Sequence, residues 1–217
     1  GALCQVTGRT LPWGDLTGIR PTKIPMKLLE EGWKNTEIAR YMRETYGVSN
    51  EKTALAITIA NREKALLQDL DYENGYSLYV GIPFCPSICL YCSFGSHPLE
   101  RWTKRVDEYL DTLCKELTFI REQMGARKLT TVYIGGGTPT TLEPEQLRRL
   151  LSHIQKTFDF TWVKEYTVEA GRPDSITKEK LQVMKEFPVT RISVNPQTMN
   201  QKTLDLIGRR HTVEQVR

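Results

Sequence analysis

Apolar residues follow two different spacings in the larger, C-terminal part of the chain. From residue 76 onward, short apolar runs alternate with longer stretches in which apolar residues recur every three or four positions. The short runs predict buried strands, and the longer stretches predict helices with one apolar face. We expect strands at 77–83, 130–134, 164–169 and 190–195, and helices near 101–125, 143–157, 177–186 and 200–207. Repeated strand–helix units predict a parallel sheet with helices packed against it.

The first 75 residues show helical spacing only. Helices are expected at 24–33, 36–46 and 51–70, whereas residues 1–23 are rich in proline and glycine and are expected to form a loop. The segment 71–75 then interrupts the pattern. The sequence therefore predicts a helical N-terminal region at 1–75 and an α/β domain at 76–217.

The length of the strand–helix units indicates a barrel-like architecture. The four units average about 35 residues each, close to an eight-unit TIM barrel of about 250 residues. We expect half of such a barrel, or most of a six-unit partial barrel. The chain begins at Gly1 rather than methionine and ends at Arg217 soon after the fourth unit, so we expect it to be part of a longer protein.

Composition excludes several classes of protein. The 217 residues are 39% hydrophobic and 26% charged, as in ordinary globular proteins. No run approaches the roughly 18 apolar residues of a membrane span. The net charge of +4 suits an anionic substrate and does not indicate nucleic acid as a partner. Five cysteines, three of them clustered, predict a reducing cytoplasm rather than a disulfide framework.

The cluster of cysteines is the strongest chemical signal. Residues 79–94 read YVGIPFCPSICLYCSF, which places Cys85, Cys89 and Cys92 in a loop directly after the first strand of the α/β domain. Two prolines end that strand and keep the following residues in the loop. Three thiolates so close together favour a soft metal, which offsets their mutual repulsion.

Three interpretations of these thiols stay open. A [4Fe–4S] cluster held by three cysteines would leave one iron free to bind a small molecule, since such clusters usually take four. A zinc site with His97 as fourth ligand is the rival metal site, although structural zinc sites usually take ligands from two separated segments. Three buried structural thiols are the remaining alternative.

The other strand ends also carry polar or glycine-rich segments. In barrels of this kind, chemistry collects where the strands end. The second strand is followed by GGGTP at 135–139, the third ends at Glu169, and the fourth precedes Asn195-Pro196-Gln197, with Arg209 and Arg210 beyond the next helix. Each segment has an ordinary alternative as a loop or a solvated charge, so their convergence is what predicts one site. His211 is a further candidate for binding an anion.

The cysteine spacing resembles that of the radical S-adenosylmethionine (SAM) enzymes. In that superfamily three cysteines hold a [4Fe–4S] cluster, and SAM chelates the open iron. The segments YVGIPFCPSICLYC, YIGGGTPTTL, TVEA and NPQTMNQKTLDLIGRRHT together resemble the oxygen-independent coproporphyrinogen III oxidases. The N-terminal LPWGDLTGIRPTK resembles the variant of this family from certain anaerobic bacteria.

This resemblance implies a fold, cofactors and a reaction. The fold is a partial (β/α) TIM-like radical SAM barrel, truncated after about four units. The cluster ligands are the three loop cysteines. The reaction is oxidative decarboxylation of coproporphyrinogen III, an anionic tetrapyrrole, to protoporphyrinogen IX, with a flavodoxin- or ferredoxin-like one-electron donor. By position, the residues that contact SAM are Tyr79, Gly136, Gly137, Thr138, Glu169, Gln197 and Arg209.

One departure from the family keeps alternative functions open. The best-studied oxidases carry a further cysteine two residues after the third ligand, whereas this chain continues from Cys92 with Ser93 and Phe94. This setting also resembles a sister group thought to act as haem chaperones. The function is therefore expected to be that of the oxidase, of a haem-binding or haem-transfer protein, or of a radical SAM methyltransferase acting on a tetrapyrrole.

Overall fold

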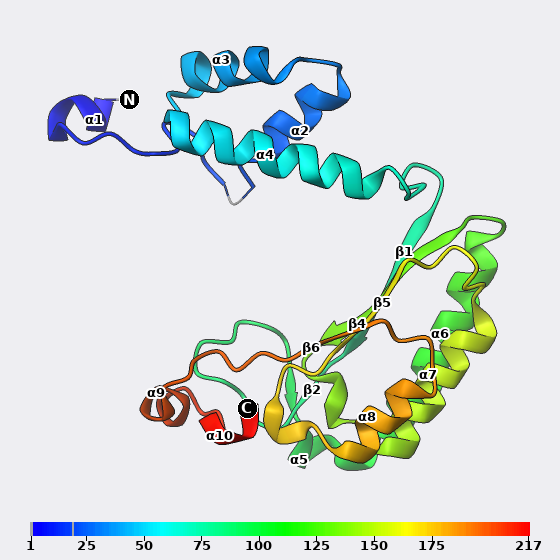
Figure 1. Cartoon of the computed structure of the whole chain (residues 1–217). Coiled ribbons are helices and arrows are strands. Elements are labelled where there is room, and N and C mark those ends of the chain that lie inside the picture. Colours follow the sequence, from blue (N-terminus) through cyan, green and yellow to red (C-terminus); the bar gives the residue numbers. More distant parts are fainter. Residues whose placement is uncertain (1, 19) are drawn as a thin grey trace. The chain divides into compact units, whose positions relative to one another are not determined.

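The computed structural model describes residues 2–18 and 20–217 and divides the chain into two compact units, Gly1–Asp71 and Tyr72–Arg217 (Figure 1). The boundary lies a few residues before the one expected at 75/76. Within the LPWGDLTGIRPTK segment, Ile19 lies outside the described residues.

The first unit is helical. Its helices are α1 (Ala2–Thr7), α2 (Lys23–Glu30), α3 (Asn35–Tyr46) and α4 (Asn50–Leu67). The apolar faces of α2, α3 and α4 meet in a small core that includes Ile38, Met42 and Ala56. The prediction of a continuous loop at 1–23 was wrong at its start, because the glycines and prolines that suggested a loop begin only at Gly8, after α1.

The second unit is built on a four-stranded parallel sheet. Its strands are β1 (Tyr76–Ile82), β4 (Leu129–Gly136), β5 (Glu165–Glu169) and β6 (Arg191–Ser193), in the order β1-β4-β5-β6. Ile82 is paired with Gly136, and Glu169 with Ser193, so the carboxyl ends of the strands lie along one edge. The predicted α/β fold with four parallel strands is confirmed.

One face of this sheet is covered by α6 (Val106–Met124), α7 (Pro144–Thr157) and α8 (Lys178–Lys185) (Figure 1). Side chains alternate along a strand, so Leu78, Val80 and Ile82 pack against the helices. Tyr79 and Tyr133 belong to the opposite set and lie on the face away from these helices. We call this second surface the open face.

Several short elements fix the loops at the carboxyl edge of the sheet. The strands β2 (Phe84–Cys85) and β3 (His97–Pro98) pair with each other and close the loop that holds the three cysteines. The remaining short elements are α5 (Leu99–Trp102), η1 (Thr103–Arg105), η2 (Pro139–Thr141), η3 (Pro173–Ser175), α9 (Gln201–Leu206) and α10 (Val213–Val216). Within the described part of the chain, no helix is long and apolar enough to span a membrane.

The glycine run after β4 lies against the backbone of β1 and β2. The Gly137 N–H donates to Ile82 O at 2.7 Å, and the Thr138 N–H donates to Phe84 O at 2.8 Å. A Cβ atom on Gly137 would lie 2.6 Å from Phe84 O, and Gly136 has a φ of +105°, where side chains are strained. These glycines therefore permit close packing of the chain against itself, apart from any role toward a ligand.

We predict that Gly137→Ala lowers the free energy of unfolding by about 1–3 kcal/mol, because the added methyl group overlaps backbone atoms that cannot move independently. Gly95→Ala is the matched control, since its Cβ would meet nothing within 4 Å, and it should change stability by no more than about 0.5 kcal/mol. Urea denaturation of the cluster-free protein measures both. Equal stability of the two variants would contradict the close approach at Gly137.

Candidate functional site

The three clustered cysteines lie in a loop at the carboxyl end of β1, and we call residues 83–98 the cysteine loop. Cys85 ends β2, Cys89 is buried, and Cys92 is half-buried. The Cys92 N–H donates to Cys89 O at 3.0 Å, which forms a turn between the last two thiols. All three thiols are free. Among the residues that the structure describes, no three His, Cys, Asp or Glu side chains are already gathered as a metal site.

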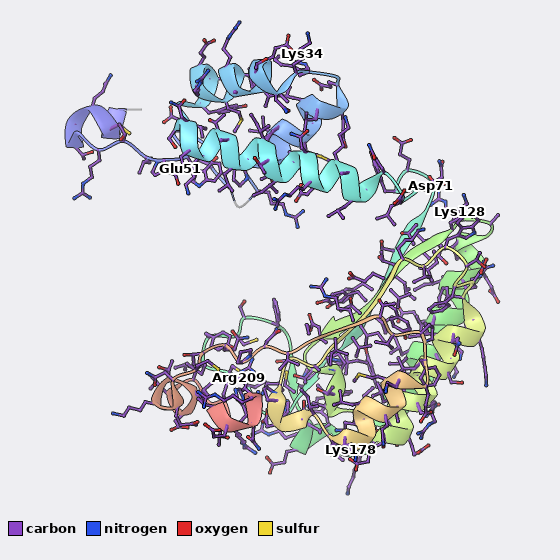
Figure 2. The ribbon with its side chains drawn as sticks, viewed as in Figure 1. Lys34, Glu51, Asp71, Lys128, Lys178 and Arg209 are labelled. Atoms are coloured by element: carbon purple, nitrogen blue, oxygen red, sulfur yellow. The ribbon has the colours of Figure 1, made fainter. Side chains whose placement is uncertain are left out.

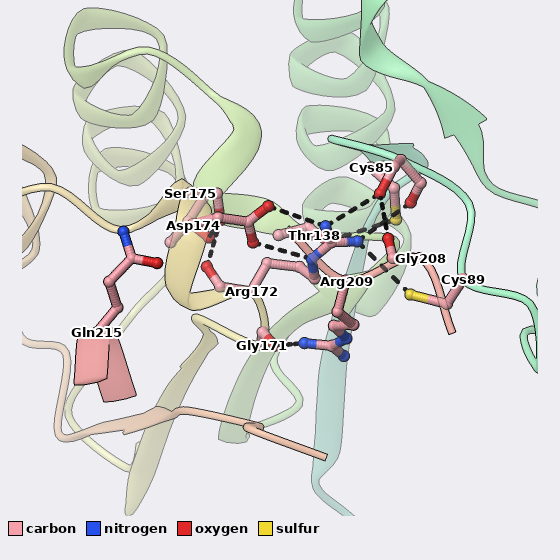
Figure 3. Close-up of polar contacts among 12 residues, drawn as sticks. Cys85, Cys89, Thr138, Gly171, Arg172, Asp174, Ser175, Gly208, Arg209 and Gln215 are labelled. Carbon is pink, nitrogen blue, oxygen red and sulfur yellow. Dashed lines mark hydrogen bonds and ion pairs between the residues drawn. The ribbon is translucent and has the colours of Figure 1, made fainter. Parts of the chain in front are cut away.

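Arg172, in the connection after β5, holds the first half of the cysteine loop. Only 3% of this side chain is exposed. Its Nη1 donates to Ser87 O at 3.2 Å, and its Nη2 donates to Ser87 Oγ at 3.1 Å. Nη1 also lies 3.5 Å from Cys89 Sγ, within hydrogen-bonding distance for sulfur (Figure 3). One buried cation therefore contacts both the backbone of the loop and one of its thiols.

Asp174 compensates the charge of Arg172. Its two carboxylate oxygens accept from Arg172 Nε at 3.0 Å and Nη2 at 2.9 Å (Figure 3). Burial acts to raise the pKa of Asp174, but the hydrogen bond and charge of Arg172 outweigh it and lower that pKa. The pair is therefore charged at neutral pH. Sequence reasoning missed it, although the Arg-Pro-Asp run directly after a strand end was a visible signal.

Arg209 holds the second half of the cysteine loop. It follows α9, is labelled in Figure 2, and is almost fully buried. Its Nη1 donates to Gly171 O at 2.9 Å and Asn195 O at 3.0 Å, which join the ends of β5 and β6. Its Nη2 donates to Tyr91 OH at 3.2 Å. Its Nε has no partner among the described residues. The guanidinium is thus largely engaged by the protein, and its contact with SAM remains a prediction.

The remaining cysteine contact comes from the glycine segment. Cys85 Sγ lies 3.4 Å from Thr138 Oγ1, and Thr138 is buried. A cavity of about 280 Å³ is lined by Tyr79, Gly136, Gly137 and residues 94–96 of the cysteine loop, among others. The structure therefore places three predicted SAM-contacting residues around one hollow, together with part of the cysteine loop.

Glu169 reaches the same region from β5 on the open face of the sheet. Its Oε1 accepts a hydrogen bond from Tyr133 OH at 2.5 Å. That hydrogen bond raises the pKa of Tyr133 to about 12. The Tyr133 ring stacks on Tyr79, with 5.8 Å between centroids and 10° between planes. Tyr133 was missed from the sequence, and only the pairing of β1 with β4 brings it opposite Tyr79.

Gln197 is the predicted residue that the structure connects least to the others. Its side chain is exposed, and it is the one non-glycine residue in the described ranges with a positive φ, at 67°. It follows β6 by a few residues, so it belongs to the same edge of the sheet. Its contact with SAM stays a prediction.

A comparison of the sequence with models of protein families assigns the second unit to a known family. The model of the Radical SAM superfamily matches residues 79–217, which include the cysteine loop and all four strand ends. The chain belongs to the radical SAM superfamily. Membership of this superfamily implies SAM and a [4Fe–4S] cluster as cofactors.

Two bacterial proteins resemble the chain in sequence. The chain is 41% identical over 213 residues to the oxygen-independent coproporphyrinogen-III oxidase-like protein HemZ of Bacillus subtilis, covering 96% of this chain and 42% of that protein. It is 40% identical over 141 residues to the haem chaperone HemW of the same organism, covering 64% of this chain and 36% of HemW.

A solved structure shows the same fold. Coproporphyrinogen III oxidase (HemN) from Escherichia coli matches with a TM-score of 0.60 and 29% identity, over 70% of this chain and 35% of HemN. The radical SAM chain thus spans about two fifths of the length of the relatives that it matches. The expected family, partial radical SAM fold and cofactors are confirmed by these comparisons.

The residues of the site fit these cofactors by their chemistry. Iron–sulfur clusters are bound by thiolates and take hydrogen bonds at sulfur. Three free thiols occupy one loop, and Arg172 already donates toward Cys89. A carboxylate that can accept hydrogen bonds from a ribose, Glu169, lies on the adjoining open face.

His211 lies near the charged groups of Arg209, Asp174 and Arg172. It is fully buried, and neither ring nitrogen has a hydrogen-bond partner among the described residues. Burial, and then the charge of Arg209, lower its pKa. The neutral imidazole is therefore the favoured form in the folded protein.

We predict that the protein loses stability as the pH falls below about 6.5, the ordinary pKa of histidine. The unfolded chain then binds a proton that folded His211 resists, which favours unfolding, whereas this penalty is absent above that pH. His211→Gln should flatten this part of the profile, and His97→Gln, a change at an exposed histidine, should leave it unchanged. Urea denaturation between pH 5 and pH 8 measures the slope. An identical slope in wild type and His211→Gln would refute the assignment.

Proposed function

We propose that the protein carrying this chain is an oxygen-independent coproporphyrinogen III oxidase. The observation that carries the proposal is the share of this chain that each relative covers. The match to HemZ covers 96% of the chain, and that to the coproporphyrinogen III oxidase of Escherichia coli covers 87%, at 28% identity. Both must extend into the first unit, which ends at Asp71. The HemW match covers only 64%, short enough to lie within the second unit.

The residues of the chain have distinct tasks in this proposal. Cys85, Cys89 and Cys92 hold the cluster. Glu169, oriented by Tyr133, binds the ribose hydroxyls of SAM, and the cavity beside Tyr79 and the glycine segment receives other parts of that molecule. When bound, the cluster and SAM supply a one-electron route to a carbon radical that takes hydrogen from an unactivated position.

The reaction at the substrate is an oxidative decarboxylation. Each reacting propionate loses one hydrogen atom, carbon dioxide and one further electron, and a vinyl group remains. A one-electron acceptor must take that last electron. Because the substrate carries four carboxylates, the net charge of +4 favours its binding.

We assign a cytoplasmic location and a small redox protein of the flavodoxin or ferredoxin class as electron donor. The five cysteines are free, as expected in a reducing compartment. A low-potential cluster requires a low-potential donor, and these two classes supply single electrons. Nucleic acid is not a proposed partner.

A haem chaperone is the second candidate. The 40% identity with HemW and the Ser93-Phe94 pair after the third cysteine favour it. A tetrapyrrole methyltransferase is the third, since it would use the same cofactors. The three functions differ in what happens to SAM and to the tetrapyrrole.

The test uses the reconstituted protein expressed from its natural reading frame. It is incubated under reducing, anaerobic conditions with SAM, with and without coproporphyrinogen III, and with a one-electron acceptor. The oxidase forms 5′-deoxyadenosine, carbon dioxide and vinyl product only when the porphyrinogen is present. Stoichiometric haem binding without substrate turnover would establish the chaperone instead, and S-adenosylhomocysteine would establish the methyltransferase.

We predict that the anaerobically reconstituted protein is brown and holds about four irons and four sulfides per chain. Replacement of Cys85, Cys89 or Cys92 with alanine should abolish the cluster, because each supplies one of three ligands. His97→Ala should leave the iron content unchanged, whereas a Cys3His zinc site would be lost in that variant. Metal analysis and absorption spectra measure both. Stoichiometric zinc without uptake of iron would overturn the cluster assignment.

We predict that Glu169→Ala weakens SAM binding about tenfold to a hundredfold, which corresponds to the roughly 1.5–3 kcal/mol of a charge-assisted hydrogen bond. The matched control is Glu165→Ala, a carboxylate at the other end of β5 that pairs with Arg191. Titration of SAM against the reconstituted cluster gives the affinities, and iron content confirms loading. If Glu169→Ala binds SAM as tightly as Glu165→Ala, the ribose contact is wrong.

A further inference from the structure

We propose that the buried ion pair of Arg172 and Asp174 sets the reduction potential of the cluster through Cys89. The inference rests on the proposed [4Fe–4S] site, and it adds two residues to which neither the family comparison nor the sequence analysis gave a role. In it, Arg172 is a positioning and charge-compensating residue rather than a cluster ligand.

The geometry carries the proposal in two steps. Arg172 is 3% exposed, so its charge acts in a medium of low polarity, where electrostatic effects are larger than in water. Its Nη1 lies 3.5 Å from Cys89 Sγ, and Cys89 is itself only 8% exposed. The cation is therefore adjacent to the most deeply buried of the three thiols.

Asp174 reduces the effect of the Arg172 charge on Cys89. It pairs with Arg172 through both carboxylate oxygens and is itself mostly buried, with 14% of its side chain exposed. The charge that Arg172 presents to Cys89 is therefore partly cancelled. The two residues are close in sequence, and both belong to the connection between β5 and α8.

The chemistry follows from charge balance. Reduction adds one electron, taken from the one-electron donor, to a cluster ligated by thiolates, and so adds one negative charge. A hydrogen-bond donor and a cation at a ligand sulfur stabilise that added charge and raise the potential. Removing the cation should make reduction harder, and removing the compensating carboxylate should make it easier.

Arg172 also binds Ser87, so a purely structural role must be separated from the electrostatic one. A structural role predicts that Arg172→Met and Asp174→Asn both loosen the loop and change cluster loading in the same direction. The electrostatic role predicts shifts of opposite sign in the potential. The sign is therefore the decisive readout, and it does not depend on enzymatic turnover.

The experiment measures the midpoint potential of the reconstituted cluster, without SAM, in the protein from its natural reading frame. Redox titration is followed by electron paramagnetic resonance. Arg172→Met should shift the ratio of oxidised to reduced cluster about tenfold toward oxidised, which is about 59 mV downward for a one-electron couple. Asp174→Asn should shift it upward by a similar factor, and Arg172→Lys should lie between wild type and Arg172→Met.

Lys180→Met is the matched control. Lys180 is another buried cation of this region, and its Nζ donates to Thr140 O at 2.7 Å and Ser175 O at 3.3 Å rather than to a thiol. In Lys180→Met, the midpoint potential of the cluster should stay at the wild-type value, provided that the iron content shows full loading. If Arg172→Met fails to load, Asp174→Asn still tests the sign.

Unchanged potentials, or shifts in the same direction for both members of the pair, overturn the inference while leaving the proposed function intact. A wild-type protein that takes up no cluster overturns both. A normal cluster that shows the predicted shifts in midpoint potential but no turnover of the porphyrinogen supports the inference and contradicts the oxidase assignment.

Discussion

The carboxyl edge of the sheet depends on the burial of two guanidinium groups. A buried arginine is tolerated only when its donors are matched by acceptors, since an unpaired buried charge is strongly destabilising. Arg172 meets that requirement, and Arg209 meets it at Nη1 and Nη2 but not at Nε, which has no partner among the described residues. Arg172 uses Asp174 and the cysteine loop, and Arg209 uses the ends of β5 and β6 together with Tyr91. The need to satisfy these donors is what joins the loop to the sheet.

Much of the fold could be predicted because its signals are local. The strands of the sheet were expected from short apolar runs and the long helices from apolar stripes, so their existence and order could be predicted, although β6 is largely exposed rather than buried. The two-residue strands β2 and β3 could not be found in this way. Their pairing joins the two ends of the cysteine loop, and two residues give no periodicity.

The candidate site was predictable to a different extent. Cys85, Cys89 and Cys92 are recognisable by spacing, and Glu169 by its place at a strand end. Tyr133, the hydrogen-bond partner of Glu169, could not be recognised from the sequence. It acquires this role only through the strand register that sets it opposite Tyr79. Arg209 was noticed for its charge, but its engagement with backbone carbonyls depends on where α9 returns the chain.

The glycine segment shows why one motif can serve two requirements. Gly137 must be glycine for the chain to pass close to Phe84, whatever ligand the site binds. The same close approach brings Thr138 to Cys85 and opens the hollow lined by Gly136 and Tyr79. A variant at these glycines would therefore change packing and binding together. Variants of Glu169 and Arg172 test binding with less disturbance of the backbone, since each residue acts through its side chain. Glu169 reaches the open face, and Arg172 reaches the thiol of Cys89.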